Sequence, residues 1–466
     1  MYTACMRPCR WSLIALLLLL AAAVGLSLPG SSFAAPAPSA GTLAAGGDHT
    51  CLVTAAGGVK CWGANESGEL GDGTTADRAT PVAVSALSGV ARVAAGAAFT
   101  CAVSTGGALS CWGANESGEL GDGTTANRAT PGAVSGLSSG VTDVALGISH
   151  ACAVTAAGGV KCWGGNLFGQ LGDGTETNHS TPADVTGLTS GVAAVAAGGY
   201  FSCALTLAGG VKCWGDNAFG QLGDGTTTDR SEPVDVTGLA SGVTAIGVSE
   251  GGHACAVLDS GALKCWGNNE YGQLGEDRGC PTPCTTPVDV TGMSSGVVAA
   301  TGGYFHTCAL TSSGLVKCWG NNHFGQVGDN LACGVLCGAP QNVSGLASGV
   351  AAIETGARHA CARTASQVLC WGDNFSGQLG DDGACGTLCA EPAPVPGASD
   401  FAPGDANCDH RTNSIDSAVV LQFSAGLVGS LPCAGPADVN GDGLVNAVDA
   451  ALILQYEAGL LPNLPP

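Results

Sequence analysis

The sequence predicts an all-β, seven-bladed β-propeller that is followed by a small α-helical module. A Cys-Trp-Gly step recurs seven times, at spacings of 50, 51, 51, 52, 53 and 52 residues. The fifteen residues CWGANESGELGDGTT occur at 61–75 and again, unchanged, at 111–125. A repeat of this size indicates an array of equal structural units that stack on one another. Beyond residue 397 the repeat ends, and two different segments match each other at an offset of 33 residues.

The composition excludes several classes of protein. The 466 residues include 76 Gly and only 11% charged residues, with a formal net charge of −22. An acidic chain repels a phosphate backbone, so a nucleic-acid partner is not expected. With 45% hydrophobic residues and its Gly in a regular repeat, the chain is also not expected to be disordered.

Residues 1–34 have the pattern of a secretory signal peptide. Arg7 and Arg10 precede an uncharged apolar stretch, 11–28, and small residues at Ser32 and Ala34 suit cleavage after Ala34. The alternative is an uncleaved anchor, because 18 apolar residues approach the length that spans a bilayer. No other segment could cross a membrane.

Cleavage would leave 22 of the 24 cysteines, because Cys5 and Cys9 lie in the signal peptide. An even number in an exported chain indicates a disulfide framework in an oxidising, extracellular setting.

Each unit contains a β-hairpin with one cysteine on either strand. In the first unit, Cys51 and Cys61 are equidistant from the turn residue Ala56, which places them directly opposite each other and suits a disulfide. A metal site is the alternative, but it would need two such pairs to converge on one ion. The seven expected pairs are Cys51–Cys61, Cys101–Cys111, Cys152–Cys162, Cys203–Cys213, Cys255–Cys265, Cys308–Cys318 and Cys361–Cys370.

Three further cysteine pairs have the form Cys-x-x-x-Cys and follow the Gly-Gln-Leu-Gly segment of units five to seven. They are Cys280/Cys284, Cys333/Cys337 and Cys385/Cys389. We expect local disulfides that fix these loops, since redox-active pairs usually have two residues between the cysteines.

Four short strands are expected in each unit, which is the layout of a propeller blade. In unit four, Pro233–Val236 and Val243–Ile246 follow the Gly-rich turn and precede the next hairpin. The first unit begins with 42–46, which corresponds only to the strand before a hairpin, and the last ends at 394–396 without that strand. We therefore expect the two ends to complete one shared blade and close the ring.

The side chains of the repeat offer little for catalysis. His49, His150, His253, His306 and His359 precede the first hairpin cysteine of five units, and Phe99 and Phe201 take that place in the other two. A ring of five histidines could bind a metal, with a structural role as the alternative. The Gly-Asp-Gly carboxylates occur once per unit, too far apart to act as a glycosidase pair. No phosphate loop or zinc-protease helix occurs, and the two Gly-x-Ser-x-Gly matches, at 136–140 and 292–296, lie in turns between expected strands and not at a strand-to-helix turn, so no enzyme activity is expected.

The repeat resembles that of the regulator-of-chromosome-condensation family. The pattern is clearest at 303–328, where Gly-x-x-His-Thr-Cys-Ala-Leu leads to Trp-Gly-x-Asn-x-x-Gly-Gln-x-Gly, and it recurs with variation in seven units over 41–397. The resemblance implies a seven-bladed propeller and a structural role for the histidines. Nucleotide exchange and chromatin binding by the family's founders suit an acidic, exported chain poorly. Secreted bacterial propellers of this type, among them a β-lactamase inhibitor, suit it better.

Two loops near the C-terminus carry oxygen side chains in the order that Ca²⁺ binding needs. The first loop offers positions 1, 3, 5, 9 and 12 as Asp405, Asn407, Asp409, Asn413 and Asp416; the second offers Asp438, Asn440, Asp442, Asn446 and Asp449. At position 7 the backbone carbonyls of Arg411 and Leu444 would bind. His410 replaces the Gly that allows the sharp turn, which sets the first loop apart from the second.

One amphipathic helix is expected after each loop, at 417–426 and 450–459. Two such loop–helix units resemble a type I dockerin, over 404–461 and after a linker at 398–403. The resemblance implies two Ca²⁺ ions, binding to a cohesin module, and recognition through loop positions 10 and 11, here Ser414, Ile415, Ala447 and Val448. It also implies two alternative docking orientations and an association with polysaccharide-degrading complexes. Cys408 and Cys433 are left to pair with each other.

These observations lead to one hypothesis of function and two alternatives. We expect a secreted, non-catalytic binding protein, free or attached to a cell surface, whose propeller presents a protein- or glycan-binding surface and whose dockerin-like module attaches it to a partner. The alternatives are a carbohydrate-active component of an extracellular complex, and an inhibitor of an extracellular enzyme.

Overall fold

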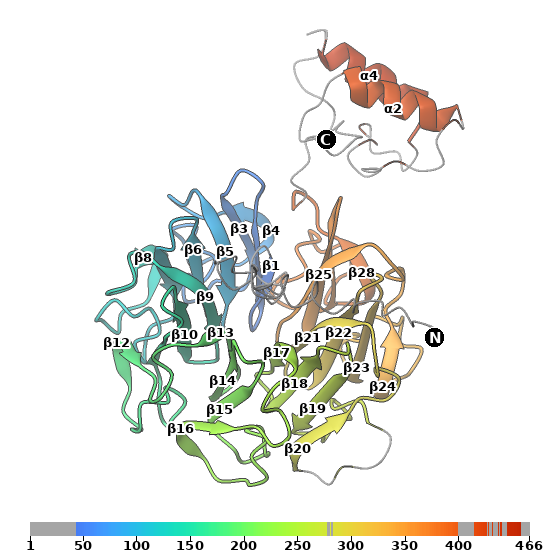
Figure 1. The fold of residues 1–466 in the computed structure, drawn as a ribbon. Helices are drawn as coiled ribbons and strands as arrows, with labels where there is room; N and C mark the ends of the chain where they lie inside the picture. The colour runs from blue at the N-terminus through green and yellow to red at the C-terminus, as the bar shows by residue number, and fades with distance from the viewer. Residues whose placement is uncertain are drawn as a thin grey trace, which may run out of the picture. The chain divides into compact units, whose positions relative to one another are not determined.

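A computed structural model shows seven four-stranded antiparallel sheets arranged around a common centre (Figure 1). It describes residues 43–276, 280, 283–398, 414–425, 427, 431, 437, 439 and 445–457. The expected signal peptide, 1–34, lies outside these residues. Neither helix in the described part of the chain has the length and apolarity that a bilayer-spanning helix needs.

The blades follow one another along the chain, and each takes four consecutive strands. The first four blades are β1 (Leu43–Ala45), β2 (His49–Val53), β3 (Val59–Gly63) and β4 (Arg78–Ala83); β5 (Val90–Ala95), β6 (Phe99–Ser104), β7 (Leu109–Gly113) and β8 (Arg128–Ala133); β9 (Val141–Leu146), β10 (His150–Thr155), β11 (Val160–Gly164) and β12 (His179–Asp184); β13 (Val192–Ala197), β14 (Phe201–Thr206), β15 (Val211–Gly215) and β16 (Arg230–Asp235). The last three are β17 (Val243–Val248), β18 (His253–Leu258), β19 (Leu263–Gly267) and β20 (Cys284–Asp289); β21 (Val297–Gly302), β22 (His306–Thr311), β23 (Val316–Asn321) and β24 (Leu336–Asn342); β25 (Val350–Thr355), β26 (His359–Thr364), β27 (Val368–Asp373) and β28 (Leu388–Pro394).

The expectation of a shared closing blade is wrong. Strand β1 pairs with β2 of its own blade, and the last blade is complete with β25 to β28. Each blade begins at the strand before its hairpin. The sequence units were counted from the hairpin cysteine, so each unit boundary separated the first strand of a blade from the other three. The ring closes by packing instead, because β1 contacts β25 just as it contacts β5.

The innermost strands converge on the centre and are therefore built from small residues. Strand β13, for example, reads VAAVAA. A glycine follows most of these strands because the next blade lies too close for a side chain. A Cβ on Gly46 would lie 2.3 Å from the carbonyl oxygen of Gly96, and one on Gly198 would lie 2.4 Å from that of Ser249.

The hairpins have the expected register. Cys51 lies opposite Cys61, and the pair forms a disulfide with a Cα–Cα distance of 4.1 Å. The other six hairpin pairs also form disulfides, at Cα–Cα distances of 4.0 or 4.1 Å. Each bond joins the two central strands of one blade, so it restrains the blade and not the ring.

One tryptophan in each blade holds neighbouring blades together. All seven are at most 1% exposed, as expected for packing residues: Trp62, Trp112, Trp163, Trp214, Trp266, Trp319 and Trp371. The indole of Trp112 donates a hydrogen bond to the main-chain oxygen of Glu69 in the preceding blade, at 2.8 Å. The same bond closes the ring, where Trp62 donates to the oxygen of Gln378 in the last blade, at 3.0 Å.

In four junctions a hydroxyl and a histidine extend this contact. Thr100 donates to the same Glu69 oxygen at 2.9 Å, and its hydroxyl lies 2.9 Å from Nε2 of His49 in the blade before it. The equivalent pairs are His150–Ser202, His253–Thr307 and His359–Thr50, at 2.8, 2.8 and 2.9 Å. Phe99 and Phe201 replace the histidine in blades two and four, and the residues that they face in the next blade are Ala151 and Ala254. The facing residue therefore has a hydroxyl opposite these four histidines and has none opposite a phenylalanine.

His306 breaks this rule. The residue that it meets in the next blade is Ala360, and both ring nitrogens of His306 are buried without a hydrogen-bond partner among the described residues. An unsatisfied buried polar group lowers stability, so this junction is weaker than the other histidine junctions.

We predict that Ala360→Ser raises the free energy of unfolding by about 0.5–1.5 kcal/mol, because the new hydroxyl accepts a hydrogen bond from His306. Denaturant unfolding measures the change. Ala151→Ser is the matched control, since its hydroxyl reaches the equivalent carbonyl but meets Phe99. Equal stabilisation by both substitutions would contradict the prediction.

We also predict that stability falls as the pH decreases from about 6.5 towards 4. Burial lowers the pKa of His306, His49 and His150 to about 4, and of the other two histidines to about 3, so the unfolded chain takes up protons in this range that the folded chain does not. Buried carboxyl groups act in the opposite direction, because burial raises the pKa of Glu250 to about 7, of Glu354 to about 8, and also that of Asp48, Glu69, Glu119, Asp143 and Asp216; we expect the five histidines to outweigh them.

The substitution His306→Phe tests the origin of this pH dependence. It removes one of the five histidines and forms a Phe–Ala pair like that of Phe99 and Ala151. Thermal unfolding between pH 7 and pH 4.5 should show a shallower decline than in the unmodified protein. An unchanged slope would place the acid sensitivity elsewhere.

Candidate functional site

The described residues of the C-terminal module include two helices, α2 (Ser414–Ser424) and α4 (Ala447–Glu457). Both begin three residues before the expected starts, 417 and 450; α2 ends at Ser424, before the expected 426, and the residues that follow Glu457 lie outside the described ones. The expected bounds are therefore wrong, because the last three loop positions already form the first helical turn.

The start of α4 shows why. Asn446 caps the helix, with its Oδ1 accepting from the N–H of Val448 at 2.8 Å, and Asp449 accepts from the N–H of Asn446 at 2.8 Å. These two bonds satisfy helix-end donors reciprocally.

The two helices pack on each other through equivalent residues. Ser417 of α2 donates to the main-chain oxygen of Ala450 in α4, at 3.0 Å, and these two residues are related by the 33-residue offset. Val420 and Ile453, another equivalent pair, are fully buried in the same small core. The module therefore presents two similar helix starts.

Three of the twelve expected calcium ligands lie within the described residues: Asp416, Asn446 and Asp449. The others lie outside them: Asp405, Asn407, Asp409, Arg411, Asn413, Asp438, Asn440, Asp442 and Leu444. Asp449 is fully buried, and its carboxylate accepts from the N–H groups of Val439 and Asn446, near the two ends of its loop. A buried carboxylate that is balanced only by N–H groups in the described residues suits a hard cation.

The four expected partner-binding residues are the first two residues of each helix. Ser414 and Ile415 begin α2, and Ala447 and Val448 begin α4. Ala447 is exposed, and Val448 is 54% exposed. A position that the sequence reasoning did not single out extends this surface: Leu454 is 44% exposed and Leu421, its equivalent in α2, is 43% exposed. They lie seven residues beyond the helix starts, on the same face, so the helical repeat could have identified them.

In the first four blades of the propeller, the Gly-Asp-Gly carboxylate holds the loop between the third and fourth strands in place. Asp72 accepts from the N–H and hydroxyl of Thr74 and forms an ion pair with Arg78 at 2.8 Å. Burial raises the pKa of Asp72, but hydrogen bonds from Thr74 and Arg78 outweigh it, and the net pKa is lowered. Blades two to four repeat the arrangement with Asp122–Arg128, Asp173–His179 and Asp224–Arg230.

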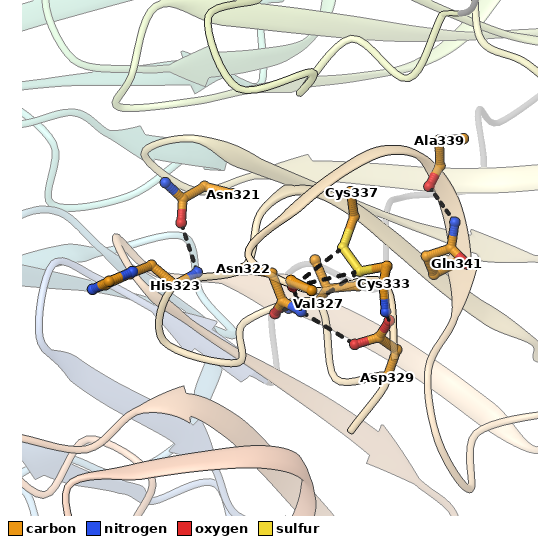
Figure 2. The surroundings of a disulfide bond; sticks show 10 residues. Asn321, Asn322, His323, Val327, Asp329, Cys333, Cys337, Ala339 and Gln341 are labelled. Carbon is orange, nitrogen blue, oxygen red and sulfur yellow. Dashed lines mark hydrogen bonds between the residues drawn. A yellow bond between two sulfur atoms is a disulfide. The ribbon is translucent and has the colours of Figure 1, made fainter. Parts of the chain in front are cut away.

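In blades five to seven a disulfide replaces this ion pair. Arg78 lies opposite Gly63 in the strand ladder, and Cys337 lies opposite the equivalent Gly320. Cys337 bonds to Cys333, whose N–H donates to Asp329 at 2.8 Å, and Asn322 lies beside the pair (Figure 2). Cys280–Cys284 and Cys385–Cys389 form the same loop disulfide.

The cysteine pairs expected in the propeller are thus all present as disulfides, and Cys408–Cys433 lies outside the described residues. Among the described residues, only Asp329, Cys333 and Cys337 offer three metal-ligating atoms within 4.8 Å. Because both sulfurs are bonded to each other, this cluster is not a metal site.

Comparisons with known proteins agree with both modules. The model of the RCC1-like domain family matches residues 27–298 and 138–417, and that of the type I dockerin domain matches residues 403–457. Type I dockerin domains generally bind calcium and are non-catalytic.

Similar proteins share the propeller. The ultraviolet-B receptor UVR8 of Arabidopsis thaliana is 34% identical over 347 residues, which cover 72% of this chain and 78% of the receptor. The human E3 ubiquitin-protein ligase HERC2 is 34% identical over 51% of this chain, but the chain spans only 5% of its length. The structure of human WBSCR16 has a TM-score of 0.63 and 25% identity, covering 74% of this chain and 94% of that chain. Yeast Prp20p has the same TM-score at 21% identity, covering 76% of this chain and 86% of that chain, and shares the fold.

We predict that removing a loop disulfide lowers the free energy of unfolding more than removing a loop ion pair does. Replacing both Cys333 and Cys337 by Ser should lower the free energy of unfolding by about 2 kcal/mol, as expected for a short disulfide loop. Arg230→Ala should lower it by less than about 1 kcal/mol, because that ion pair is partly exposed. Denaturant unfolding without reductant distinguishes them, and a larger loss for Arg230→Ala would contradict the prediction.

Proposed function

Because the chain belongs to the RCC1-like domain family and carries a C-terminal type I dockerin domain, we propose that it is a secreted, non-catalytic binding protein. Its dockerin docks to a cohesin module, and its propeller presents a binding surface. The proposal includes removal of residues 1–34 on export, a propeller over 41–397, a linker at 398–403 and a dockerin over 404–461.

The observation that supports docking most directly is the pair of equivalent helix starts. Ala447 and Val448 are exposed although they are apolar, and they stand where recognition is expected. Leu421 and Leu454 continue the apolar surface along each helix. Exposed apolar side chains at equivalent places suit a partner that can bind either helix.

Two Ca²⁺ ions are proposed for the two loops, held by the twelve residues identified above. Asp449 would close the second loop, because its carboxylate is already fixed by N–H groups from both ends of that loop. The ion would offset the repulsion between the clustered carboxylates, so folding of the module should depend on it.

An extracellular location agrees with the chemistry of the chain. Dockerin domains occur in extracellular complexes, and the described residues contain ten disulfides, which persist in oxidising compartments.

We predict that type I cohesin modules capture the protein in the presence of Ca²⁺ and that a chelator abolishes capture. Ile415→Asp or Val448→Asp alone should weaken binding only about twofold, since the other helix start remains. The double variant should lose roughly tenfold or more, because charge then enters both contact surfaces. Surface plasmon resonance measures the affinities of the three variants and of the unmodified protein, with circular dichroism in Ca²⁺ as the folding control. Binding that resists both the chelator and the double substitution would contradict the docking role.

A further inference from the structure

One face of the propeller carries most of its exposed apolar side chains. We call it the loop face: it bears the loops between the first and second strands, and between the third and fourth strands, of every blade. Leu167, Phe219 and Phe375 are 71%, 41% and 83% exposed there. On the opposite face of the propeller, Leu207 lies in a hairpin turn and is 73% exposed, which makes it comparable in exposure to Leu167 and Phe375.

The aromatic residues of the loop face follow the repeat, but only in part of the ring. The position before the Gly-Gln step is Phe168, Phe219, Tyr271 and Phe324 in blades three to six, and it is serine in the other three. Phe168 packs on Tyr200 of the next blade, with ring centroids 5.2 Å apart, and Tyr271 packs on Phe305 at 4.7 Å. In blade seven Phe375 stands one residue earlier. Five neighbouring blades thus form an aromatic arc, which the packing of the ring does not require because blades one and two lack it.

The arc ends at a pocket between blades six, seven and one, with a volume of about 590 Å³. We call it the Arg358 pocket, after its central residue. Phe324, Phe375 and Leu388 contribute apolar walls, and Asp48 and Asp373 contribute carboxylates. Its volume lies in the range of small-ligand sites, and six of its nine lining residues are polar or charged, since His323, Ser376 and Thr387 join Asp48, Arg358 and Asp373.

The polar groups of the pocket are held in place by their neighbours. The guanidinium of Arg358 lies over the ring of Phe324, 5.2 Å from its centroid, and 3.9 Å from the carboxylate of Asp373. Asp373 also accepts from the N–H of Phe375 at 3.1 Å, and Asp48 accepts from the side chain of Gln378 at 3.4 Å. Burial and the nearby Asp373 raise the pKa of Asp48, although Arg358 opposes this. Hydrogen-bond donors and acceptors therefore stand side by side next to aromatic faces.

The chemistry of these groups selects the class of ligand. Two carboxylates in a chain of net charge −22 disfavour a polyanion. A cationic side chain is also disfavoured, because Arg358 already lies over the face of Phe324 and 3.9 Å from the carboxylate of Asp373. A sugar suits the pocket: its C–H face packs on an aromatic ring, and its hydroxyls both donate to carboxylates and accept from a guanidinium.

We propose that the Arg358 pocket binds one residue of a neutral glycan chain and that the aromatic arc carries the residues that follow it. This inference deepens the binding role proposed above, on which it rests. It assigns the glycan to the propeller and leaves the dockerin for the cohesin, so the two contacts are independent.

Isothermal titration of the full chain, in Ca²⁺, with cellohexaose, xylohexaose and mannohexaose tests the proposal. At least one hexasaccharide should bind. Phe375→Ala and Arg358→Ala should each weaken that binding roughly tenfold or more, whereas Leu207→Ala, the matched exposed control, should leave it unchanged. Phe168→Ala, at the far end of the arc, should weaken a hexasaccharide more than the corresponding trisaccharide.

Several results would overturn the proposal. They are no binding of any hexasaccharide by the folded protein, binding that survives both pocket substitutions, or displacement of the sugar by hexalysine at equal concentration. Chromatography of the sugar after incubation should show it intact, since cleavage would make the Asp48–Asp373 pair catalytic and replace a binding site by a hydrolase site. Cohesin capture by the same preparations separates a failure of this inference from a failure of the docking role.

Discussion

The propeller depends on a main-chain carbonyl that every blade offers to the next. In the first junction the oxygen of Glu69 accepts from the indole of Trp112 and the hydroxyl of Thr100. A fully buried tryptophan needs a partner for its N–H, so the next blade can sit only where that carbonyl is. The last junction has the same geometry, with Gln378 and Trp62, and this makes the ring closed without a strand shared between the two ends.

Because the junctions use a main-chain oxygen and a few repeated side chains, the loops can vary without loss of the ring. The loop between the third and fourth strands has a carboxylate paired with Arg or His in four blades and a disulfide in three, at the same ladder position. The aromatic arc is a second variation, present in five neighbouring blades. Function in this fold is therefore to be sought in what differs between blades, not in what they share.

The dockerin domain is also built from a repeated unit, but a smaller one. One loop–helix unit is used twice, and the contact of Ser417 with Ala450 joins equivalent residues of the two copies. The first helical turn is shared between the loop and the helix, because Asp449 both caps α4 and closes the loop that would hold the ion. The exposed residues at the start of α4, Ala447 and Val448, are thus positioned by the same interactions that would organise the calcium loop.

The sequence by itself determined the features that depend on local spacing. The blade number, the hairpin register of Cys51 and Cys61, the loop disulfides and the presence of two C-terminal helices all follow from short separations, within which turn and strand geometry leave little choice. The calcium ligands were also identified from spacing, whereas the partner-binding residues at the helix starts follow from the resemblance to a type I dockerin; both sets remain predictions.

Only the tertiary structure decided what depends on distant residues. It showed that each blade is complete, because pairing and not the position of the chain ends defines a sheet. It also showed that a histidine in one blade meets a hydroxyl or an alanine of the next blade, which leaves His306 without a hydrogen-bond partner in the described part of the chain. The position of Arg358 over Phe324 is of the same kind: two loops of different blades meet there only because the ring brings them together.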